Sequence, residues 1–184
     1  MGADNLAVPL RNSYWVLPAR FLASEHPRDL SPEGTQRRCL ALLNAGLRAF
    51  IDLTEEDEMF GDADSGGGYR RHLQKLARQR HIEVNCIRFP ILDRSTPSVW
   101  TMRSIPELID LSIHDKNPVL VHCLAGIGRT GTVVGCFLKR HGLATHENVL
   151  EEISKLRQGM PGGREPSPHT PEQVRMVRSW KKGV

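Results

Sequence analysis

One uninterrupted run of this sequence constrains the fold more than any other. Residues 118–138 read PVLVHCLAGIGRTGTVVGCFL, in which a short apolar stretch, a loop with two glycines and a long apolar stretch follow one another. The stretch 118–122 is typical of a strand buried on both faces, and 130–140 of a buried helix. A strand that leads through a tight loop into a helix is the unit of α/β sheets, so the run predicts an α/β domain.

The rest of the chain alternates predicted strands and helices in the same way. Strands are expected at 14–16, 20–23, 49–53 and 82–89, and the first two are expected to be short edge strands because Pro18 separates them. Helices are expected at 32–45, 69–80, 104–114 and 149–156 and from 171 onward, from Ser or Thr caps, a capping box at Ser104 and Glu107, and apolar stripes. This alternation predicts a three-layer α/β domain with a mostly parallel central sheet and helices on both faces.

Length and composition limit the classes of protein that the chain can belong to. With 184 residues, 39% hydrophobic and 25% charged, residues 1–184 are expected to form one globular domain. No run of 18 apolar residues and no secretory signal is present, so we expect a cytoplasmic protein without a membrane anchor. The net charge of +4 argues against a nucleic-acid binder and implies only a mild preference for anionic substrates.

The cysteines and histidines show no metal-binding pattern. The four cysteines lack CxxC spacing and the eight histidines lack HExxH spacing, so no metal, cofactor or disulfide framework is expected. Two thiols, Cys39 and Cys86, have two interpretations. Each is either a redox partner for an oxidised Cys123 or a buried structural thiol.

The loop after the strand at 118–122 has the residues of an oxyanion site. Cys123 stands at the carboxyl end of the strand, where α/β sheets bind ligands, and the backbone N–H groups that lead into the helix converge on one point. The loop continues with five uncharged residues, Leu124, Ala125, Gly126, Ile127 and Gly128, whose glycines permit unusual backbone angles and close approaches. Arg129 can hold two phosphate oxygens at once. The same positive field stabilises a thiolate, so Cys123 is expected to be a nucleophile, with the Thr130 hydroxyl donating to its sulfur.

The string HCLAGIGRTG, residues 122–131, resembles the signature loop of the cysteine-dependent protein tyrosine phosphatases, HC-x5-R-[ST]. At this length the chain resembles the compact dual-specificity type. The resemblance implies a phosphotyrosine-phosphatase-like fold and metal-independent hydrolysis of phosphotyrosine, phosphoserine and phosphothreonine in proteins through a phosphocysteine. It also implies that His122 orders the loop rather than exchanging protons.

The resemblance further implies an aspartic acid that protonates the leaving oxygen from a loop about thirty residues before the cysteine. Asp93 stands thirty residues before Cys123, in the proline-bounded segment FPILDRSTPS. The alternative is that Asp93 only forms a turn beside proline. Rival acids are Asp57, Asp62 and Asp64, in the acidic, glycine-ended segment 55–68, which is expected to be a mobile loop.

Three other features each have two interpretations. Gln173 stands fifty residues after Cys123, where larger tyrosine phosphatases carry a water-positioning glutamine, but it also completes a capping box with Thr170. Asp52 either braces the cysteine loop or only ends a strand. The basic helix at 70–80 either docks acidic phosphoproteins or presents a solvated face.

Other functions share part of this pattern. A phosphoinositide or other non-protein phosphatase would use the same catalytic residues, although a multiply phosphorylated substrate favours lysines in the loop and this loop has none. A rhodanese-like sulfurtransferase or a non-catalytic phosphate-binding module would not need Arg129, Thr130 and Asp93 together. The expected partner is therefore a phosphorylated protein or peptide, with the chain acting as a monomer.

Overall fold

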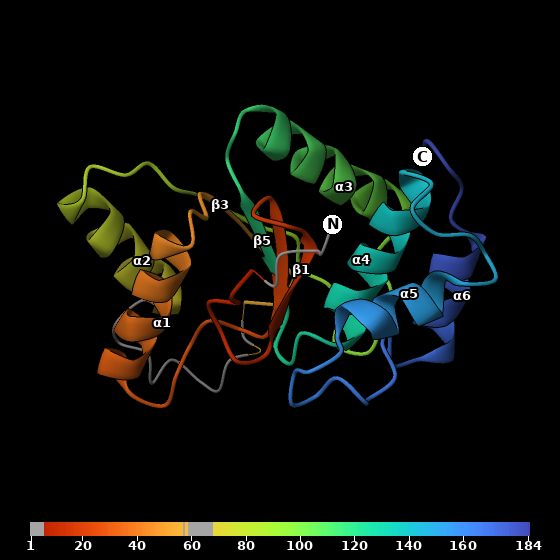
Figure 1. Ribbon diagram of the computed structural model, residues 1–184, viewed down its shortest axis with the longest axis horizontal. Helices are drawn as coiled ribbons and strands as arrows, with labels where there is room; N and C mark the ends of the chain where they lie inside the picture. The colour runs from red at the N-terminus through yellow and green to blue at the C-terminus, as the bar shows by residue number, and fades with distance from the viewer. Residues whose placement is uncertain (1–5, 57, 59–67) are drawn as a thin grey trace.

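A five-stranded sheet forms the centre of the part of the chain that the structure describes. The computed structural model describes residues 6–56, 58 and 68–184 (Figure 1). The strands are β1 (Ser13–Leu17), β2 (Phe21–Ser24), β3 (Ala49–Asp52), β4 (Asn85–Arg88) and β5 (Val119–His122). Their order across the sheet is β1-β2-β5-β3-β4, and only the β1–β2 pair is antiparallel. The predicted mostly parallel sheet is confirmed.

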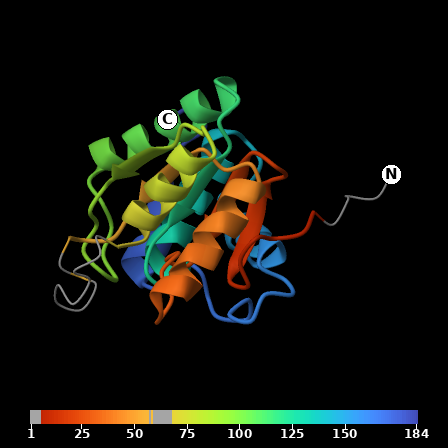
Figure 2. The same cartoon turned by 90° about the vertical axis from the view of Figure 1, so that its left-hand side faces the viewer.

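Helices cover both faces of this sheet. One face is covered by α1 (Pro32–Asn44) and α2 (Gly68–Gln79), which lie side by side in front of the sheet in Figure 2. The other face is covered by α3 (Val99–His114), α4 (Gly128–Arg140), α5 (Val149–Leu156) and α6 (Pro171–Ser179), as Figure 1 shows. The three-layer arrangement expected from the sequence is therefore confirmed.

The sheet separates two hydrophobic clusters because successive side chains of a strand point to opposite faces. Along β5, Val119 and Val121 pack toward the α4 side, whereas Leu120 packs toward α1 and α2. All three side chains are completely buried, as expected for the apolar run at 118–122. The central strand thus fixes the position of the loop that follows it.

The chain order places this loop at a topological switch point. The α2 connection from β3 to β4 crosses one face, and the α3 connection from β4 back to β5 crosses the other. The carboxyl ends of the parallel strands lie at one edge of the sheet, and open α/β sheets bind ligands at such a point. Residues 123–127, between β5 and α4, therefore occupy the expected ligand-binding position.

The prediction that the second strand lies at an edge is wrong. β2 pairs with β1 on one side and in parallel with β5 on the other, and Phe21 and Leu22 are completely buried. The prediction relied on Pro18, but Pro18 lies in the turn between β1 and β2 and so interrupts no hydrogen-bond ladder. The edges of the sheet are β1 and β4, and β4 is shorter than the predicted range 82–89.

The predicted start of α3 is also wrong. The helix begins at Val99, after the N-cap Ser98, whose side chain accepts a hydrogen bond from the Thr101 N–H. Ser104 lies inside the helix and donates its hydroxyl to the Trp100 carbonyl, so it caps nothing. Pro106, which the prediction placed in the first turn of the helix, is buried in the helix interior.

No helix in the described parts of the chain is long and apolar enough to cross a bilayer. The segment 55–68, predicted to be a mobile loop, lies largely outside the described residues, as do the rival acids Asp57, Asp62 and Asp64.

Candidate active site

The loop after β5 packs directly against the chain that follows β2. Gly126 has a φ of +72°, and a Cβ atom built there would stand 2.6 Å from the backbone of Ser24 and Glu25. Glycine is therefore required at this position for both its angle and its lack of a side chain. The His26 N–H donates to the Leu124 carbonyl at 2.9 Å. The loop is thus supported from one side by residues 24–26.

The other glycine of the loop, Gly128, packs against a side chain rather than against backbone. Gly128 is the first residue of α4, and a Cβ atom there would stand 3.3 Å from the side-chain amide of Gln173. The N-cap of α4, Ile127, makes no side-chain capping bond. The first N–H groups of this thirteen-residue helix have no cap, and the helix dipole directs positive potential toward the loop. Such an end binds an oxyanion readily.

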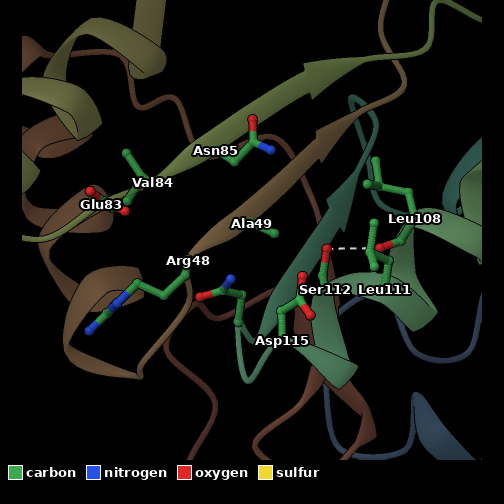
Figure 3. A pocket seen from close by; sticks show the side chains of 10 residues that line it. Arg48, Ala49, Glu83, Val84, Asn85, Leu108, Leu111, Ser112 and Asp115 are labelled. Atoms are coloured by element: carbon green, nitrogen blue, oxygen red, sulfur yellow. Dashed lines mark hydrogen bonds between the residues drawn. The ribbon is translucent and has the colours of Figure 1, made fainter.

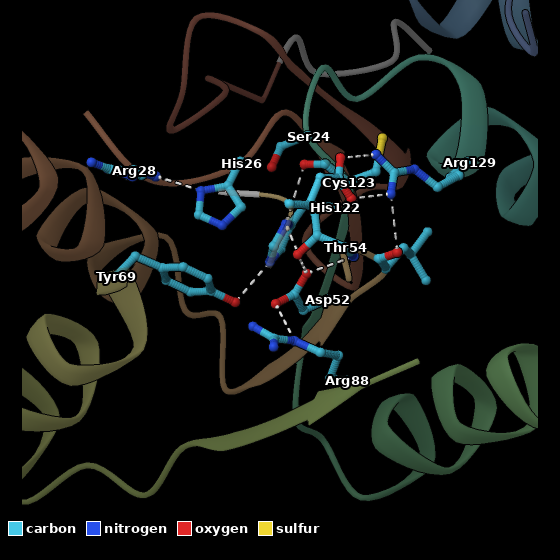
Figure 4. A network of polar contacts seen from close by, with 12 residues as sticks. Ser24, His26, Arg28, Asp52, Thr54, Tyr69, Arg88, His122, Cys123 and Arg129 are labelled. Atoms are coloured by element: carbon cyan, nitrogen blue, oxygen red, sulfur yellow. Dashed lines mark hydrogen bonds and ion pairs between the residues drawn. The ribbon is translucent and has the colours of Figure 1, made fainter. Parts of the chain in front are cut away.

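Arg129 is the most completely enclosed cation of the site (Figure 4). Its side chain is 1% exposed, and Nη1 donates to Glu58 Oε2 at 2.5 Å and to the Ile91 carbonyl at 2.9 Å. Nη2 donates to Glu58 Oε1, and it lies 3.1 Å from Asp93 Oδ1. Burial alone would lower the pKa of Arg129, but Glu58, Cys123 and Asp93 outweigh it and raise the pKa.

These contacts leave one edge of the guanidinium for a ligand. Glu58 binds the edge formed by Nη1 and Nη2, whereas the buried Nε has no hydrogen-bond partner among the described residues. An unpartnered buried donor costs free energy, which a bound oxyanion would recover. The edge formed by Nε and Nη2 of Arg129 is therefore the one suited to phosphate.

Glu58 is a site residue that sequence reasoning missed. It lies in the acidic segment 55–68, where only the aspartates were considered, as rival acids. Its bidentate contact with Arg129 joins residues 71 positions apart, so no local spacing signals it. Burial opposes the charge of Glu58, but Arg129 outweighs it and lowers the pKa of the carboxyl.

The structure brings Asp93 to the mouth of the site. The residue is 60% exposed in its side chain and lies in the segment between β4 and α3, with Oδ1 at 3.1 Å from Arg129 Nη2. A carboxyl beside this cation lies within reach of an anion bound to it. Asp93 also lies in a turn, which the Ser95 N–H closes by donating to the Leu92 carbonyl at 3.0 Å, so both interpretations of Asp93 stay open.

Of the two interpretations of Gln173, the structure shows the capping box, and the water-positioning role stays a prediction. Gln173 forms this box with Thr170 at the start of α6. Its Nε2 also donates to the Ser95 carbonyl at 2.9 Å, two residues after Asp93. The fully buried side chain of Gln173 therefore lies between the segment that contains Asp93 and Ser95 and the start of α4.

The Thr130 hydroxyl is completely buried, and Oγ1 has no hydrogen-bond partner in the described part of the chain. A buried hydroxyl without a partner is unusual and calls for a functional explanation. Thr130 stands one residue after Arg129 in the first turn of α4, but its hydroxyl makes no hydrogen bond to the sulfur of Cys123 in this structure, so the donation expected from the sequence stays a prediction.

A buried polar network lies behind the cysteine (Figure 4). His122 Nδ1 lies 3.4 Å from the Cys123 carbonyl, which can only accept, so Nδ1 carries the hydrogen. Nε2 therefore accepts, and the Tyr69 hydroxyl donates to it at 2.7 Å. His26 packs edge-on against both rings. This arrangement fits the expected ordering role of His122, and Tyr69 and His26 are contributors that the sequence did not reveal.

Asp52 anchors the same network. It is fully buried at the end of β3, opposite His122 in the register. Oδ1 accepts from the Thr54 N–H at 2.9 Å and hydroxyl at 2.6 Å, and Oδ2 accepts from Arg70 at 3.1 Å and Arg88 at 3.2 Å. Burial raises the pKa of Asp52, but its neighbours outweigh burial and hold the pKa below its usual value. Asp52 thus does more than end a strand.

The two buried imidazoles should make the protein less stable in mild acid. Burial lowers the pKa of His122 to about 4 and also lowers the pKa of His26. The unfolded chain takes up these protons near pH 6.5, so stability that is present above about pH 6.5 is lost as the pH falls toward about 4. The free energy of unfolding, from urea titrations, should drop by several kcal/mol across this range, of which His122 accounts for roughly 3 kcal/mol.

The variant His26→Asn should reduce that pH dependence, because an amide oxygen can replace Nδ1 as acceptor for the Arg28 N–H without titrating. His114→Asn is the matched control, since its side chain is 84% exposed. A free energy of unfolding that stayed constant between about pH 7 and about pH 4.5 would contradict this account of His122.

The other two thiols named in the sequence analysis lie on the far side of the sheet. Cys39 belongs to the cluster beneath α1 and α2, and Cys86 packs against the same cluster, whereas Cys123 belongs to the opposite cluster. Burial raises the pKa of Cys39 to about 12 and that of Cys86 to about 11. These features favour the structural interpretation of both thiols over the redox one.

Figure 3 shows a hollow between the sheet and α3. It has a volume of about 440 Å³ and is lined by the first residues of β3 and β4, Ala49 and Asn85, and by Ser112 and Asp115 near the end of α3. The amino ends of parallel strands lie at the edge of the sheet opposite Cys123. This hollow is therefore separate from the candidate active site.

The fold and the site together define a class of protein. A thiol at the end of the central strand, an uncapped helix start and a buried arginine fork are the parts of a cysteine-dependent phosphatase of the compact dual-specificity type. Residues 27–143 match the family model described as "Polymorphic toxin system, DSP-PTPase phosphatase". The chain belongs to this family.

Individual relatives agree with that assignment. The chain is 40% identical to the dual specificity protein phosphatase CDC14B of Mus musculus, in a match that covers 80% of this chain and 27% of the relative. It is 35% identical to the phosphatidylinositol 3,4,5-trisphosphate 3-phosphatase and protein-tyrosine-phosphatase PTEN1 of Arabidopsis thaliana, over 50% of this chain and 22% of that protein. The chain thus spans about a quarter of the length of these relatives.

The fold itself is shared with solved structures. The active form of Tk-PTP superposes with a TM-score of 0.70 at 21% identity, covering 94% of this chain and 98% of that one. The phosphotyrosine-phosphatase-like fold implied by the sequence resemblance is confirmed.

Proposed function

We propose that this chain is a metal-independent phosphate monoester hydrolase that acts on phosphotyrosine, and also on phosphoserine and phosphothreonine, in proteins through a phosphocysteine intermediate. The observation that carries the proposal is the buried Arg129, which faces the Cys123 loop with its Nε unpartnered among the described residues and with Asp93 at 3.1 Å. The names of the CDC14B and PTEN1 relatives support it.

In the first step, the Cys123 thiolate attacks phosphorus in line with the leaving oxygen. The bond between Sγ and phosphorus forms while the bond from phosphorus to the leaving oxygen breaks. Arg129 and the N–H groups of residues 124–129 hold the three equatorial oxygens. Asp93 gives its proton to the leaving oxygen, which departs as a neutral hydroxyl group.

In the second step, water releases the phosphoryl group. The water attacks phosphorus while Asp93, now a carboxylate, takes a proton from it. Gln173 orients this water from its place beside Ser95, two residues after Asp93. The electron pair of the sulfur–phosphorus bond returns to Sγ, where the Thr130 hydroxyl stabilises the thiolate. Phosphate leaves and the enzyme regains its starting protonation.

The role of Asp93 is tested by Asp93→Asn. With a phosphotyrosine peptide, kcat should fall by about 10²–10⁴-fold, because an amide cannot donate the proton. With nitrophenyl phosphate the loss should be smaller, since this leaving group needs the proton less. The basic limb of the kcat–pH profile should flatten, because it reports the loss of the protonated acid. Steady-state kinetics with both substrates measure these effects.

Asp115→Asn is the matched control, because Asp115 lines the hollow at the opposite edge of the sheet. It should leave both substrates unaffected. Equal losses for good and poor leaving groups in Asp93→Asn would show that another group is the acid, and Asp57, Asp62 and Asp64 would be tested next.

A phosphoinositide is the second candidate substrate, and the name of the PTEN1 relative favours it. The five residues Leu124, Ala125, Gly126, Ile127 and Gly128 offer no cation to a second phosphate, which favours the protein substrate. Phosphate release from phosphotyrosine, phosphothreonine and soluble phosphoinositide substrates decides between them. A kcat/KM tenfold higher for a phosphoinositide than for the best phosphotyrosine peptide would contradict the protein-phosphatase assignment.

The proposal extends to the organisation of the protein. Residues 1–184 act as one catalytic domain, which the 94% coverage by Tk-PTP supports. We also propose that the chain acts as a monomer in the cytoplasm, where reducing conditions keep thiols such as Cys123 free. Size-exclusion chromatography with light scattering tests the oligomeric state.

A further inference from the structure

A hollow of about 370 Å³ opens beside the phosphate-binding loop, between that loop and the segment that joins β2 to α1. Leu124, the residue after Cys123, forms one wall, and Arg28 and Leu30 of the joining segment lie on the other side. The hydrogen bond from His26 N–H to the Leu124 carbonyl and the contact of Gly126 with Ser24 hold the two segments together. The hollow therefore adjoins the candidate active site at Leu124, the residue that follows Cys123.

The hollow offers apolar surface for which folding gives no reason. Leu30 is fully exposed and Leu124 is 40% exposed, and neither belongs to a hydrophobic cluster of the core. A single exposed leucine is ordinary, but two that border one hollow beside the Cys123 loop make an exposed apolar surface at its rim. Such a surface gains free energy when another apolar side chain covers it.

The charged groups around the hollow do not oppose an apolar occupant. Glu25 and Arg38 neutralise each other in an ion pair at 2.6 Å. The Asp29 carboxylate accepts from the backbone and hydroxyl of Ser31 at the start of α1. Arg28 makes no ion pair with any described residue, so its charge adds a weak attraction for a substrate that is itself anionic.

We infer that this hollow, lined by Leu30 and Leu124, is a specificity subsite that receives an apolar side chain immediately before or after the phosphorylated residue of a peptide substrate. The inference rests on the proposed function. Neighbouring Cα atoms of a peptide are 3.8 Å apart, so a residue next to one whose phosphate reaches Cys123 must lie at the rim of the loop, where Leu124 is exposed. The subsite thus selects among phosphorylated proteins by the residue beside the phosphate.

The test compares phosphotyrosine peptides that carry Leu or Ala directly before or after the phosphotyrosine. The unchanged protein should show a kcat/KM about 5–10-fold higher for at least one leucine peptide than for its alanine counterpart, as expected for partial burial of one side chain. In Leu30→Ala this ratio should fall to less than about 2, because half of the apolar wall is removed. Turnover of nitrophenyl phosphate, which lacks flanking residues, should be unchanged in the variant.

Leu111→Ala is the matched control, since Leu111 is 56% exposed and lines the hollow at the opposite edge of the sheet. It should keep the leucine preference. An unchanged protein without a leucine preference, or a Leu30→Ala variant that retains it, would overturn the subsite while nitrophenyl phosphate turnover upholds the proposed function. Absence of nitrophenyl phosphate turnover would overturn the proposed function and the subsite with it.

Discussion

Replacing Cys123 with Ser should reduce kcat for nitrophenyl phosphate by more than about three orders of magnitude, while phosphate or vanadate still binds. A serine hydroxyl is not ionised at neutral pH, so the attack on phosphorus loses its nucleophile. The binding groups remain, because Arg129 and the N–H groups of the loop do not depend on the sulfur. Release of nitrophenol measures turnover, and titration calorimetry measures the binding of phosphate or vanadate.

Cys136→Ser is the matched control for that variant. Cys136 is completely buried in α4, thirteen residues after Cys123, and takes no part in the proposed reaction. Its replacement should affect stability more than kcat at a temperature where the protein is folded. Undiminished turnover by Cys123→Ser would exclude the phosphocysteine mechanism.

Arg129→Lys should lower kcat/KM by about 10³-fold or more, in the range seen when a transition-state cation or donor is removed. A lysine keeps the charge but cannot contact Glu58, the Ile91 carbonyl and two phosphate oxygens at once, as the guanidinium can. Steady-state kinetics give the loss, and a thermal unfolding curve shows whether the variant is folded at the assay temperature.

Arg140→Lys is the control for Arg129→Lys, because Arg140 ends the same helix and pairs with Asp110 at 3.2 Å. It should keep kcat/KM within about 2-fold, since a partly exposed ion pair contributes little. A loss of less than tenfold in a folded Arg129→Lys variant would contradict the assignment of the arginine fork.

The fold was predictable where local pattern and global position agree. The apolar run at 118–122 and the apolar stretch at 130–140 both indicated burial, and both elements lie in the core. The caps at Ser31 and Thr170 were also correct, because a cap is a contact within one turn of its helix. Such signals depend only on neighbours in the chain.

The predictions that failed concern elements whose position depends on contacts with distant parts of the chain. Pro18 and Ser104 carry strong local signals, but the sheet pairing of β2 and the burial of Pro106 in α3 override them. The residues of the candidate site likewise fall into those with a local sequence signal and those without one. The contiguous loop from His122 to Gly131 was visible in the sequence, and the spacing that the family resemblance implies selected Asp93, which lies 3.1 Å from Arg129. Glu58 and Tyr69 reach Arg129 and His122 across 71 and 53 residues, and no sequence spacing reports such contacts.

The central claim is that Cys123 carries the phosphoryl group during turnover without help from a metal ion. The most direct measurement is mass spectrometry of the peptide that contains Cys123, after rapid acid quenching of a reaction run with an aryl phosphate and EDTA. The account predicts one added phosphoryl group on Cys123 in the quenched sample and full turnover in EDTA. Turnover abolished by EDTA, or a phosphoryl group found on another residue while Cys123 stays unmodified, would contradict it.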